Sequence, residues 1–335
     1  MTSTAALMAA LAAGMVVMVA AAAPAAKIVI AHRGASGYLP EHTLAAKAMA
    51  HAQGADYLEQ DVVLSKDGVP VVLHDIHIDT VTDVARRFPE RKRADGRYYA
   101  LDFTVAELKQ LNASERFDPR TGIAVFPSRF PVGKGAFQVP TLEEELQLIQ
   151  GLNKSTGREA GVYPEIKEPA WHRTQGRDIS PIVLDLLARY GYKTKVDKVY
   201  VQCFDDAEVR RIRTELGYKG RLVQLIEGSR PLLDEHARLR TPAGLAEIAK
   251  VADGIGPALS DVLSRRSDGG LEATSLVRDA HALHLEVHPY TFRADALPPG
   301  VASLEDLFRV ALFDIGVDGV FTDFPDRAVA FLRKR

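Results

Sequence analysis

The stretch YLEQDVVLSKDGVPVVLHD, residues 57–75, decides which kind of sheet this sequence can form. It contains two apolar, β-branched runs, Tyr57–Val63 and Val69–Leu73, with only Leu64-Ser-Lys-Asp-Gly68 between them. That connection is too short for the crossover that joins parallel strands, and Asp67-Gly68 is a strong signal for a hairpin turn. We therefore predict one strand of a parallel sheet followed by a returning hairpin arm.

The hairpin also predicts a pairing register. With Asp67-Gly68 as a two-residue turn, Lys66 faces Val69, and the same register places His74 opposite Asp61. Because successive side chains point to opposite faces of a strand, a slip by one residue would turn each side chain to the other face. The expected position of His74 therefore depends on the length of the turn.

Outside this hairpin, further short β-branched runs alternate with longer helical patterns. These runs are Ile28–Ala31, Gly161–Ile166, Val199–Gln202, Leu222–Leu225, Ala252–Ile255, Leu285–His288 and Gly319–Phe321. Such alternation is typical of a parallel sheet in which a helix follows each strand. When the hairpin arm is left out, the number of strands is the eight that a TIM barrel needs. The sequence therefore predicts an α/β fold, a (β/α)8 TIM barrel.

Three sequence signals predict where helices begin. Thr141-Leu-Glu-Glu144 is a capping box, in which the threonine and the second glutamate satisfy each other's backbone N–H groups. Ser180-Pro181 offers an N-cap followed by proline at the first helical position. Ser303 with Asp306 repeats the capping pattern before an apolar helix.

The alternation of strands and helices breaks between His74 and Pro140, in a stretch rich in Arg, Asp, Pro and Gly. This stretch is much longer than an ordinary loop between a strand and a helix. Long loops at the carboxyl face of a barrel usually cover the active site, and we expect the same here. We interpret its basic run, Arg86–Arg97, as a solvated charged face, with contact to an anionic substrate as the alternative.

Composition excludes several classes of function. The formal net charge is −2, so no global field favours nucleic acid, and nucleic-acid motifs are absent from the sequence. We therefore predict no nucleic-acid partner. The chain has a single cysteine, Cys203, which excludes a disulfide scaffold or a cysteine zinc site within one chain.

The first 26 residues, MTSTAALMAALAAGMVVMVAAAAPAA, carry no charged side chain. An apolar stretch rich in small residues is typical of a secretory signal peptide, although the usual basic start is missing. We predict a signal peptide over residues 1–26, cleaved after Ala22 or a few residues later, and no stable membrane insertion of the mature domain, residues 27–335. An uncleaved anchor is the alternative, because Ala5 to Ala23 is almost long enough to span a bilayer.

Acidic residues interrupt two of the predicted buried strands. Glu59 and Asp61 are two positions apart and so share one face of their strand, while Glu165 lies near the end of a later strand. Buried charges are costly unless they have partners. Three carboxylates form an oxygen-rich site that suits Ca2+ or Mg2+. The alternative is a structural network of salt bridges with Arg33 and Lys167.

Two histidines stand at strand ends beside these carboxylates. His32 directly follows the run Ile28–Ala31, and His74 follows the hairpin arm. Histidine titrates near neutral pH and can act as an acid or as a base, so we predict His32 and His74 as the catalytic pair. Other residues near strand ends are expected to bind substrate, namely Arg33, Lys167, Gln202, Phe204, His288 and Tyr290.

Together these motifs resemble the glycerophosphodiester phosphodiesterase family, and specifically its periplasmic bacterial members. The matching residues are His32-Arg33-Gly34, Glu41-His-Thr43, Glu59-x-Asp61, Lys66-Asp-Gly68, His74-Asp75, Pro140-Thr-Leu142, Glu165-x-Lys167, Gln202-x-Phe204 and Thr322-Asp323. Each motif is weak alone, but their order and spacing are specific. The resemblance runs from about Ile28 to the C-terminus and departs from the common pattern at Cys203, where a serine is frequent.

The resemblance implies a TIM barrel with a subdomain inserted at about residues 76–139. It implies a site in which Ca2+ or Mg2+ is held by Glu59, Asp61 and Glu165, with His32 and His74 as general base and acid and Arg33 at the phosphate. The substrates would be small glycerophosphodiesters. The neighbouring glycerol hydroxyl would attack first and give a cyclic phosphate, which water then opens to release sn-glycerol 3-phosphate and an alcohol.

The same resemblance implies a location in the periplasm and leaves open whether the chain forms a homodimer. Two other functions remain as alternatives. A phospholipase C or D on the same barrel would need an apolar rim to meet a membrane, whereas the long segment after His74 is mostly polar and basic. A non-catalytic phosphodiester-binding protein would tolerate loss of a histidine or a carboxylate, yet both histidines and all three carboxylates are present.

Overall fold

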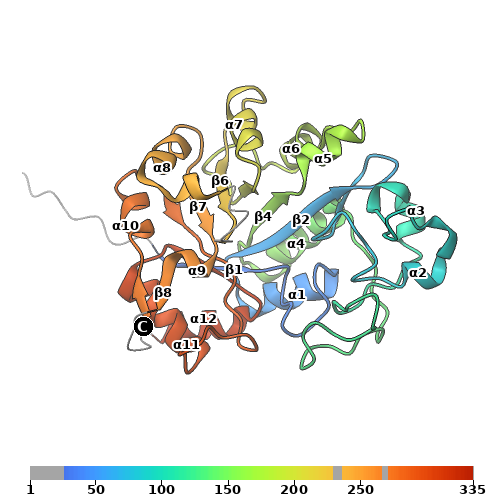
Figure 1. The fold of residues 1–335 in the computed structure, drawn as a ribbon, viewed down its shortest axis with the longest axis horizontal. Helices are drawn as coiled ribbons and strands as arrows, with labels where there is room; N and C mark the ends of the chain where they lie inside the picture. The colour runs from blue at the N-terminus through green and yellow to red at the C-terminus, as the bar shows by residue number, and fades with distance from the viewer. Residues whose placement is uncertain (1–25, 229–235, 266–270, 335) are drawn as a thin grey trace, which may run out of the picture.

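The computed structural model describes residues 26–228, 236–265 and 271–334. Within these ranges, parallel strands form a ring in the order β10-β7-β6-β5-β4-β2-β1-β11 (Figure 1). Their bounds are β1 Ile28–Ala31, β2 Tyr57–Leu64, β4 Gly161–Ile166, β5 Tyr200–Cys203, β6 Arg221–Ile226, β7 Gly254–Pro257, β10 Glu286–Val287 and β11 Gly319–Thr322. Backbone hydrogen bonds bridge the seam between β10 and β11, among them Asp318 N to Val287 O at 3.0 Å. The predicted TIM barrel is confirmed, as an almost closed barrel.

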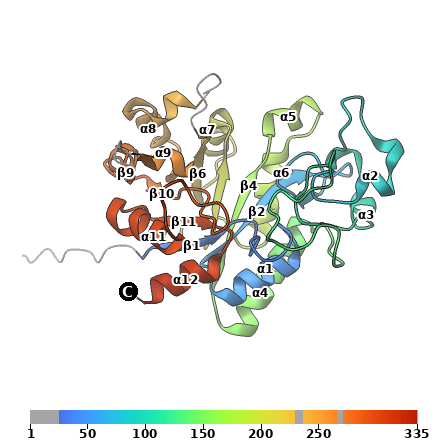
Figure 2. The same cartoon turned by 60° about the horizontal axis from the view of Figure 1, so that its bottom comes forward.

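Helices follow the strands and cover the outside of the ring (Figures 1 and 2). Those packed around the ring include α1 Leu44–Gln53, α4 Leu142–Thr156, α6 Ile179–Arg189, α7 Asp206–Thr214, α8 Pro242–Ile248, α10 Leu276–His281, α11 Leu304–Arg309 and α12 Pro325–Arg333. Other elements are α5 Pro169–Thr174, η3 Ala237–Arg240, α9 Leu259–Val262, the π-helical turn η4 Val310–Ile315, and a separate antiparallel pair of β8 Leu263–Arg265 and β9 Leu271–Ala273.

Two of the three predicted helix starts are confirmed. The capping box at Thr141 opens α4, and the Ser303 side chain caps α11. The predicted N-cap at Ser180 is wrong, because α6 begins at Ile179, two residues before the predicted start at Pro181, and has Asp178 at the N-cap position. The Ser180 hydroxyl lies inside the helix and donates instead to the carboxylate of Glu208 on α7. A tertiary hydrogen bond has therefore replaced the expected local one.

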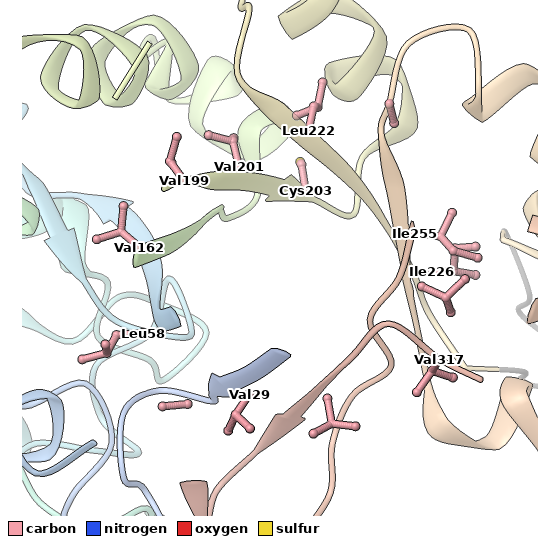
Figure 3. Close-up of a cluster of buried hydrophobic side chains, with 14 of the residues drawn as sticks. Val29, Leu58, Val162, Val199, Val201, Cys203, Leu222, Ile226, Ile255 and Val317 are labelled. Carbon is pink, nitrogen blue, oxygen red and sulfur yellow. The ribbon is translucent and has the colours of Figure 1, made fainter. Parts of the chain in front are cut away.

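Side chains alternate along the barrel strands between an outer and an inner layer, as strand geometry requires. The outer layer is aliphatic and turns away from the centre of the ring toward the helices (Figure 3). It includes Val29, Leu58, Val162, Val201, Cys203, Leu222 and Ile255. The inner layer holds a second cluster, formed by Ile30, Tyr57, Tyr163, Tyr200, Val223 and Phe321. This largely aromatic plug fills the barrel toward the amino-terminal ends of the strands. The carboxyl-terminal ends are left for polar residues.

The hairpin arm is confirmed, but its predicted register is wrong. Strand β3, Pro70–Val72, pairs antiparallel with β2. The backbone N–H of Leu73 donates to the carbonyl of Asp61 at 2.8 Å, so Leu73 lies opposite Asp61 in the place predicted for His74. His74 is thereby moved one position further along the arm.

The slip has a cause in the turn. The N–H of Ser65 donates to the carbonyl of Val69 at 3.0 Å, so three residues, 66–68, form the loop. Gly68 has a φ of 78°, the left-handed conformation that closes a three-residue hairpin loop. Because Asp-Gly is found in both two-residue and three-residue turns, the dipeptide alone could not set the register.

Residues 76–139, here called the inserted segment, contribute no barrel strand. They contain only short elements, α2 Val84–Arg87, η1 Pro89–Arg91, η2 Ala100–Asp102 and α3 Val105–Leu108. A separate buried cluster, which includes Ile78, Phe103 and Leu108, packs with Val63 and Val71 of the hairpin. In both views the segment, drawn in teal and green, lies beside β2 and away from α8 (Figures 1 and 2).

The arginines of the basic run form ion pairs with carboxylates of the same segment. The ion pairs are Arg86 and Arg87 with Asp83, Arg91 with Glu107, Arg93 with Asp102, and Arg97 with Asp79. Pairs with this degree of exposure contribute little stability each. The charge of these arginines is thus already paired within the segment, and nothing in these contacts favours a substrate role.

The predicted signal peptide, residues 1–26, lies outside the described residues except for its last position. Across the ranges that the structure describes, no helix has both the length and the apolar character needed to cross a membrane.

Candidate active site

Polar inner-layer side chains gather at the carboxyl end of the barrel. On β2 the inner positions pass from Tyr57 to Glu59 and Asp61, and on β4 they pass from Tyr163 to Glu165. The two strands are neighbours, and their register pairs Asp61 directly with Glu165. One oxygen from each of the three carboxylates lies within 4.8 Å of the others. These three residues, here called the carboxylate cluster, therefore converge as the sequence predicted.

The carboxylate cluster has the properties of a cation site. Glu59, Asp61 and Glu165 are 4%, 1% and 5% exposed. Burial and the neighbouring negative charges raise the pKa of Glu59 well above its usual range, and burial above all raises the pKa of Glu165 to about 8. The buried Oδ1 of Asp61 accepts no hydrogen bond from any described residue. Carboxylates that oppose one another's ionisation and leave an oxygen free fit a hard divalent cation such as Ca2+ or Mg2+.

Salt bridges exist in the cluster but do not balance it. Lys167 Nζ lies 2.7 Å from Glu165 Oε1, and Arg33 Nε lies 3.6 Å from Asp61 Oδ2. Glu59 accepts hydrogen bonds from uncharged donors, one of them the backbone N–H of Arg33 at 2.8 Å. Its pKa stays raised despite the nearby guanidinium. A purely structural network of ion pairs would therefore leave the buried carboxylate of Glu59 without a positive charge that balances it.

His32 stands at the end of β1, with its two ring nitrogens in different surroundings. Nδ1 lies 2.5 Å from Oδ1 of Asp323, just beyond β11, the strand paired with β1. Nε2 lies 3.9 Å from Oε2 of Glu59. Burial, followed by the positive charge of Arg33, lowers the pKa of His32 to about 4. The ring is therefore a neutral imidazole held through Nδ1, with Nε2 toward the carboxylate cluster, as a general base requires.

His74, beyond the hairpin arm, has the same arrangement. Its Nδ1 lies 2.7 Å from Oδ1 of Asp75, and both side chains are partly exposed. Desolvation of the ring inside the cavity, with the positive charges of Arg33 and Lys167, lowers the pKa of His74 below its usual range. His74 and His32 line the same cavity as the carboxylate cluster. The structure thus brings together the five residues that the sequence selected as catalytic or metal-binding.

Arg33 is held in an unusual backbone conformation beside the cluster. Its φ of 57° is in the left-handed region, which residues other than glycine rarely adopt. The next residue, Gly34, has a φ of 86°, and a Cβ there would meet the carbonyl carbon of Ala46 at 2.9 Å. This turn aims the Arg33 N–H at Glu59, while its guanidinium Nη1 donates to Glu41 at 3.0 Å. Strained turns of this kind concentrate at functional sites.

The cavity above the carboxylate cluster has a volume of about 340 Å³, enough for a small ligand. Of the residues predicted to bind substrate, Arg33, Gln202, Phe204 and Tyr290 line it. Lys167 lines an adjoining hollow that also contacts His74, Glu165, Phe204 and Tyr290. His288 is not among the described residues that line either space. It is 1% exposed, lies deeper in the barrel, and has Nδ1 3.0 Å from the hydroxyl of Tyr163.

Sequence reasoning missed several residues that hold this site. His42 Nε2 lies 2.7 Å from Oδ2 of Asp61, and Arg293 lines the cavity and donates to Asp323 at 2.8 Å. Glu41 and His42 were quoted in a motif, but no role was assigned to them. Arg293 carried no signal, because it follows a short strand in an irregular loop.

A fully buried ion pair supports the cluster from behind. Lys47 and Glu145 side chains are both 0% exposed, with Nζ 2.7 Å from Oε2, and Nζ also lies 3.4 Å from Nδ1 of His42. We expect Lys47→Met to lower the free energy of unfolding by about 3–5 kcal/mol, because Glu145 is left buried without its cation. Urea unfolding measures this.

The matched control is Arg327→Met. Arg327 pairs with Glu305 near the surface, with side chains 35% and 44% exposed. Loss of an exposed pair costs about 0–1 kcal/mol. If Lys47→Met costs no more than this control, the buried pair does not stabilise the site as argued.

Comparison with known proteins agrees with this geometry. The chain matches the glycerophosphoryl diester phosphodiesterase family over residues 32–327. The glycerophosphodiester phosphodiesterase of Haemophilus influenzae is 45% identical over 327 residues, covering 92% of this chain and 90% of the relative. That of Treponema pallidum is 40% identical over 328 residues, covering 92% of each. A solved structure from Silicibacter pomeroyi, described by the same family name, is 28% identical with a TM-score of 0.68 and covers 93% of this chain and 95% of that one.

The carboxylate cluster, the two imidazoles and Arg33 lie at the carboxyl face of a (β/α)8 barrel, where barrel enzymes carry their active sites. Both histidines and the whole cluster fall within the matched range. The chain belongs to the glycerophosphoryl diester phosphodiesterase family. It is an enzyme, a phosphoric diester hydrolase of the glycerophosphodiester phosphodiesterase type.

Proposed function

We propose that this enzyme converts small, soluble glycerophosphodiesters to sn-glycerol 3-phosphate and a free alcohol, with His32 and His74 as its acid–base pair. The observation that carries the proposal is the shared cavity, in which two imidazoles, each held through Nδ1 by a carboxylate, stand beside the carboxylate cluster. The names of the relatives from Haemophilus influenzae and Treponema pallidum support the substrate class.

The proposed cation is Ca2+, with Mg2+ as the alternative, held by carboxylate oxygens of Glu59, Asp61 and Glu165. When bound, the cation supplies positive charge beside the phosphoryl oxygens and stabilises the charge that develops there. Arg33 supplies charge from the protein itself, since its guanidinium lines the cavity and is fixed by Glu41. Such preorganised charges act without reorganisation during the reaction.

In the first proposed step, one histidine takes the proton of the glycerol hydroxyl next to the phosphodiester. That oxygen forms a bond to phosphorus, the bond from phosphorus to the alcohol oxygen breaks, and the other histidine gives its proton to the leaving oxygen. In the second step, the two histidines exchange roles: one takes a proton from the water that attacks phosphorus, the ring bond from phosphorus to the oxygen that attacked first breaks, and the other gives its proton to that oxygen. One water is consumed in total, and both rings regain their first protonation states.

The acid must carry a proton although burial lowers the pKa of both rings. A bound phosphodiester is an anion, and a nearby negative charge raises the pKa of an imidazole. Substrate binding is therefore expected to protonate one of the two histidines. The alcohol and glycerol portions would contact Gln202, Phe204 and Tyr290, with Lys167 at the adjoining hollow. We leave His288 out of the proposed contacts because of its depth.

The proposal extends to location and domain organisation. We propose that residues 1–26 direct export to the periplasm as a signal peptide. We also propose the inserted segment as a subdomain of the mature enzyme, supported by its separate buried cluster. Edman sequencing of the mature N-terminus tests the first point, and a start at Met1 would contradict it.

Substrate turnover tests the function directly. We expect the purified enzyme with Ca2+ to release glycerol 3-phosphate from glycerophosphocholine, measured by a coupled dehydrogenase assay, and to act far more slowly on phosphatidylcholine vesicles. Faster turnover of vesicles would favour the phospholipase alternative. Saturable binding of glycerophosphocholine without any turnover would favour a binding protein.

A further inference from the structure

The inserted segment sends one arginine to each of the two carboxylates that hold the candidate catalytic histidines. Arg116 reaches Asp75, the partner of His74. Arg129 reaches Asp323, the partner of His32. The two branches use different parts of the segment and different strand ends, yet each has the same order of arginine, carboxylate and imidazole.

The first branch also includes the arginine of the cavity. Arg116 Nη1 donates to Oδ2 of Asp75 at 2.7 Å, leaving Oδ1 of that carboxylate for His74. The rest of the guanidinium binds Glu41 through two hydrogen bonds, of 2.6 Å and 3.1 Å. Glu41 in turn accepts from Arg33 at 3.0 Å. One guanidinium therefore ties the carboxylate of His74 to the carboxylate of Arg33.

The second branch is more deeply buried. Arg129 Nη2 donates to Oδ2 of Asp323 at 2.6 Å, again leaving Oδ1 for the histidine. The side chains of Arg129 and Asp323 are 4% and 1% exposed. Asp295 accepts two further hydrogen bonds from this guanidinium, from Nε at 2.8 Å and from the same Nη2 at 3.0 Å. Arg293 donates to the same oxygen of Asp323 from the barrel side.

We propose that Arg116 and Arg129 are positioning residues of the reaction, through which the inserted segment holds Asp75 and Asp323, and hence His74 and His32, in their reactive orientation. A carboxylate bound at Nδ1 fixes both the tautomer and the direction of the imidazole. The carboxylate does so only if it cannot rotate, and a planar guanidinium is well suited to lock it. This inference depends on the proposed acid–base roles of the two histidines.

The competing explanation is that the two arginines merely attach the inserted segment to the barrel. In that case their loss would reduce stability or substrate binding, with no special relation to either histidine. Double-mutant cycles separate the two explanations, because residues that act through one another have non-additive effects. The cycles use Arg116→Gln and Arg129→Gln, each alone, in His74→Ala and in His32→Ala.

We expect each glutamine variant alone to lower kcat about tenfold to a hundredfold, since a small misplacement of a catalytic group has effects of that size. Arg116→Gln should have a clearly smaller effect on kcat in His74→Ala than in His32→Ala, because only the part that passes through Glu41 and Arg33 remains when His74 is absent. Arg129→Gln should show the reverse pattern. Wild-type kcat in both single arginine variants, or a full effect in the matched histidine variant, would overturn the inference.

Arg93→Gln is the matched control. Arg93 also lies in the inserted segment and binds a carboxylate, Asp102, through two hydrogen bonds of 2.7 Å, but it reaches neither histidine. Its kcat should equal that of the wild type. If a glutamine variant does not fold, the lysine variant at that position replaces it, because lysine keeps the charge and loses only the planar fork. If His32→Ala and His74→Ala lose activity as expected but the arginine variants keep wild-type kcat, this inference is refuted and the proposed function still stands.

Discussion

The variants His32→Ala and His74→Ala are each expected to lose at least about a hundredfold in kcat, because general acid–base catalysis contributes about 10²–10⁴-fold. Each ring lines the cavity and is held through Nδ1, so that Nε2 is the nitrogen available for proton transfer. Both variants should still fold. Asp323 keeps its bonds to Arg129 and Arg293, and Asp75 keeps its bond to Arg116. Glycerol 3-phosphate release and circular dichroism give the two measurements.

His281→Ala provides the comparison. His281 also binds a carboxylate, with Nε2 2.8 Å from Oδ2 of Asp318, but it lies on α10, outside the cavity. This variant should retain near-normal turnover. If His32→Ala or His74→Ala behaves like His281→Ala, the role proposed for that histidine is wrong.

Removal of divalent cations is expected to abolish turnover, and addition of Ca2+ should restore it. The physical reason is that Glu59, Asp61 and Glu165 are buried together, and the raised pKa values of Glu59 and Glu165 show that their charges are not balanced by the protein. Ca2+ should therefore also stabilise the fold, by about 2.7 kcal/mol at a concentration one hundred times the Kd. Thermal unfolding with and without chelator measures this shift.

Glu165→Gln should weaken Ca2+ binding at least about tenfold, because even residues that only support metal ligands have effects of about 10–100-fold. Calorimetric titration with Ca2+ gives the affinity without any activity assay. Glu286→Gln is the control, since Glu286 lies on β10, accepts from the Tyr200 hydroxyl at 2.6 Å and does not line the cavity. Equal affinity in both variants would exclude Glu165 as a ligand.

The periodicity of hydrophobic residues correctly predicted those parts of the fold that depend on neighbouring residues. The strands formed where β-branched runs had been identified, and spacing by two placed Glu59 and Asp61 on one face. The errors were also local. Asp67-Gly68 is compatible with two turn lengths, so the register of His74 slipped by one residue. Ser180 has a capping side chain, but a hydrogen bond to Glu208 on the next helix placed it inside α6.

The side-chain contacts that orient the catalytic residues could not be predicted from the periodicity of the sequence. Arg116 and Arg129 lie in an irregular stretch with no periodicity, where nothing distinguishes them from the arginines that pair within the inserted segment. His42 precedes α1 and reaches Asp61 only because α1 packs against the barrel. His288 directly follows a strand, as a binding residue would, yet its side chain points into the aromatic plug beside Tyr163.

By itself, the sequence determined which residue types stand at the carboxyl ends of parallel strands, because hydrophobic alternation and turn chemistry act over a few neighbouring residues. Only the tertiary structure decided which of them meet in one cavity and what holds them there. Those contacts join positions as distant as His32 and Asp323, which meet because β1, the first strand of the chain, pairs with β11, the last. Ring closure depends on packing of the whole barrel, and no short stretch of sequence specifies it.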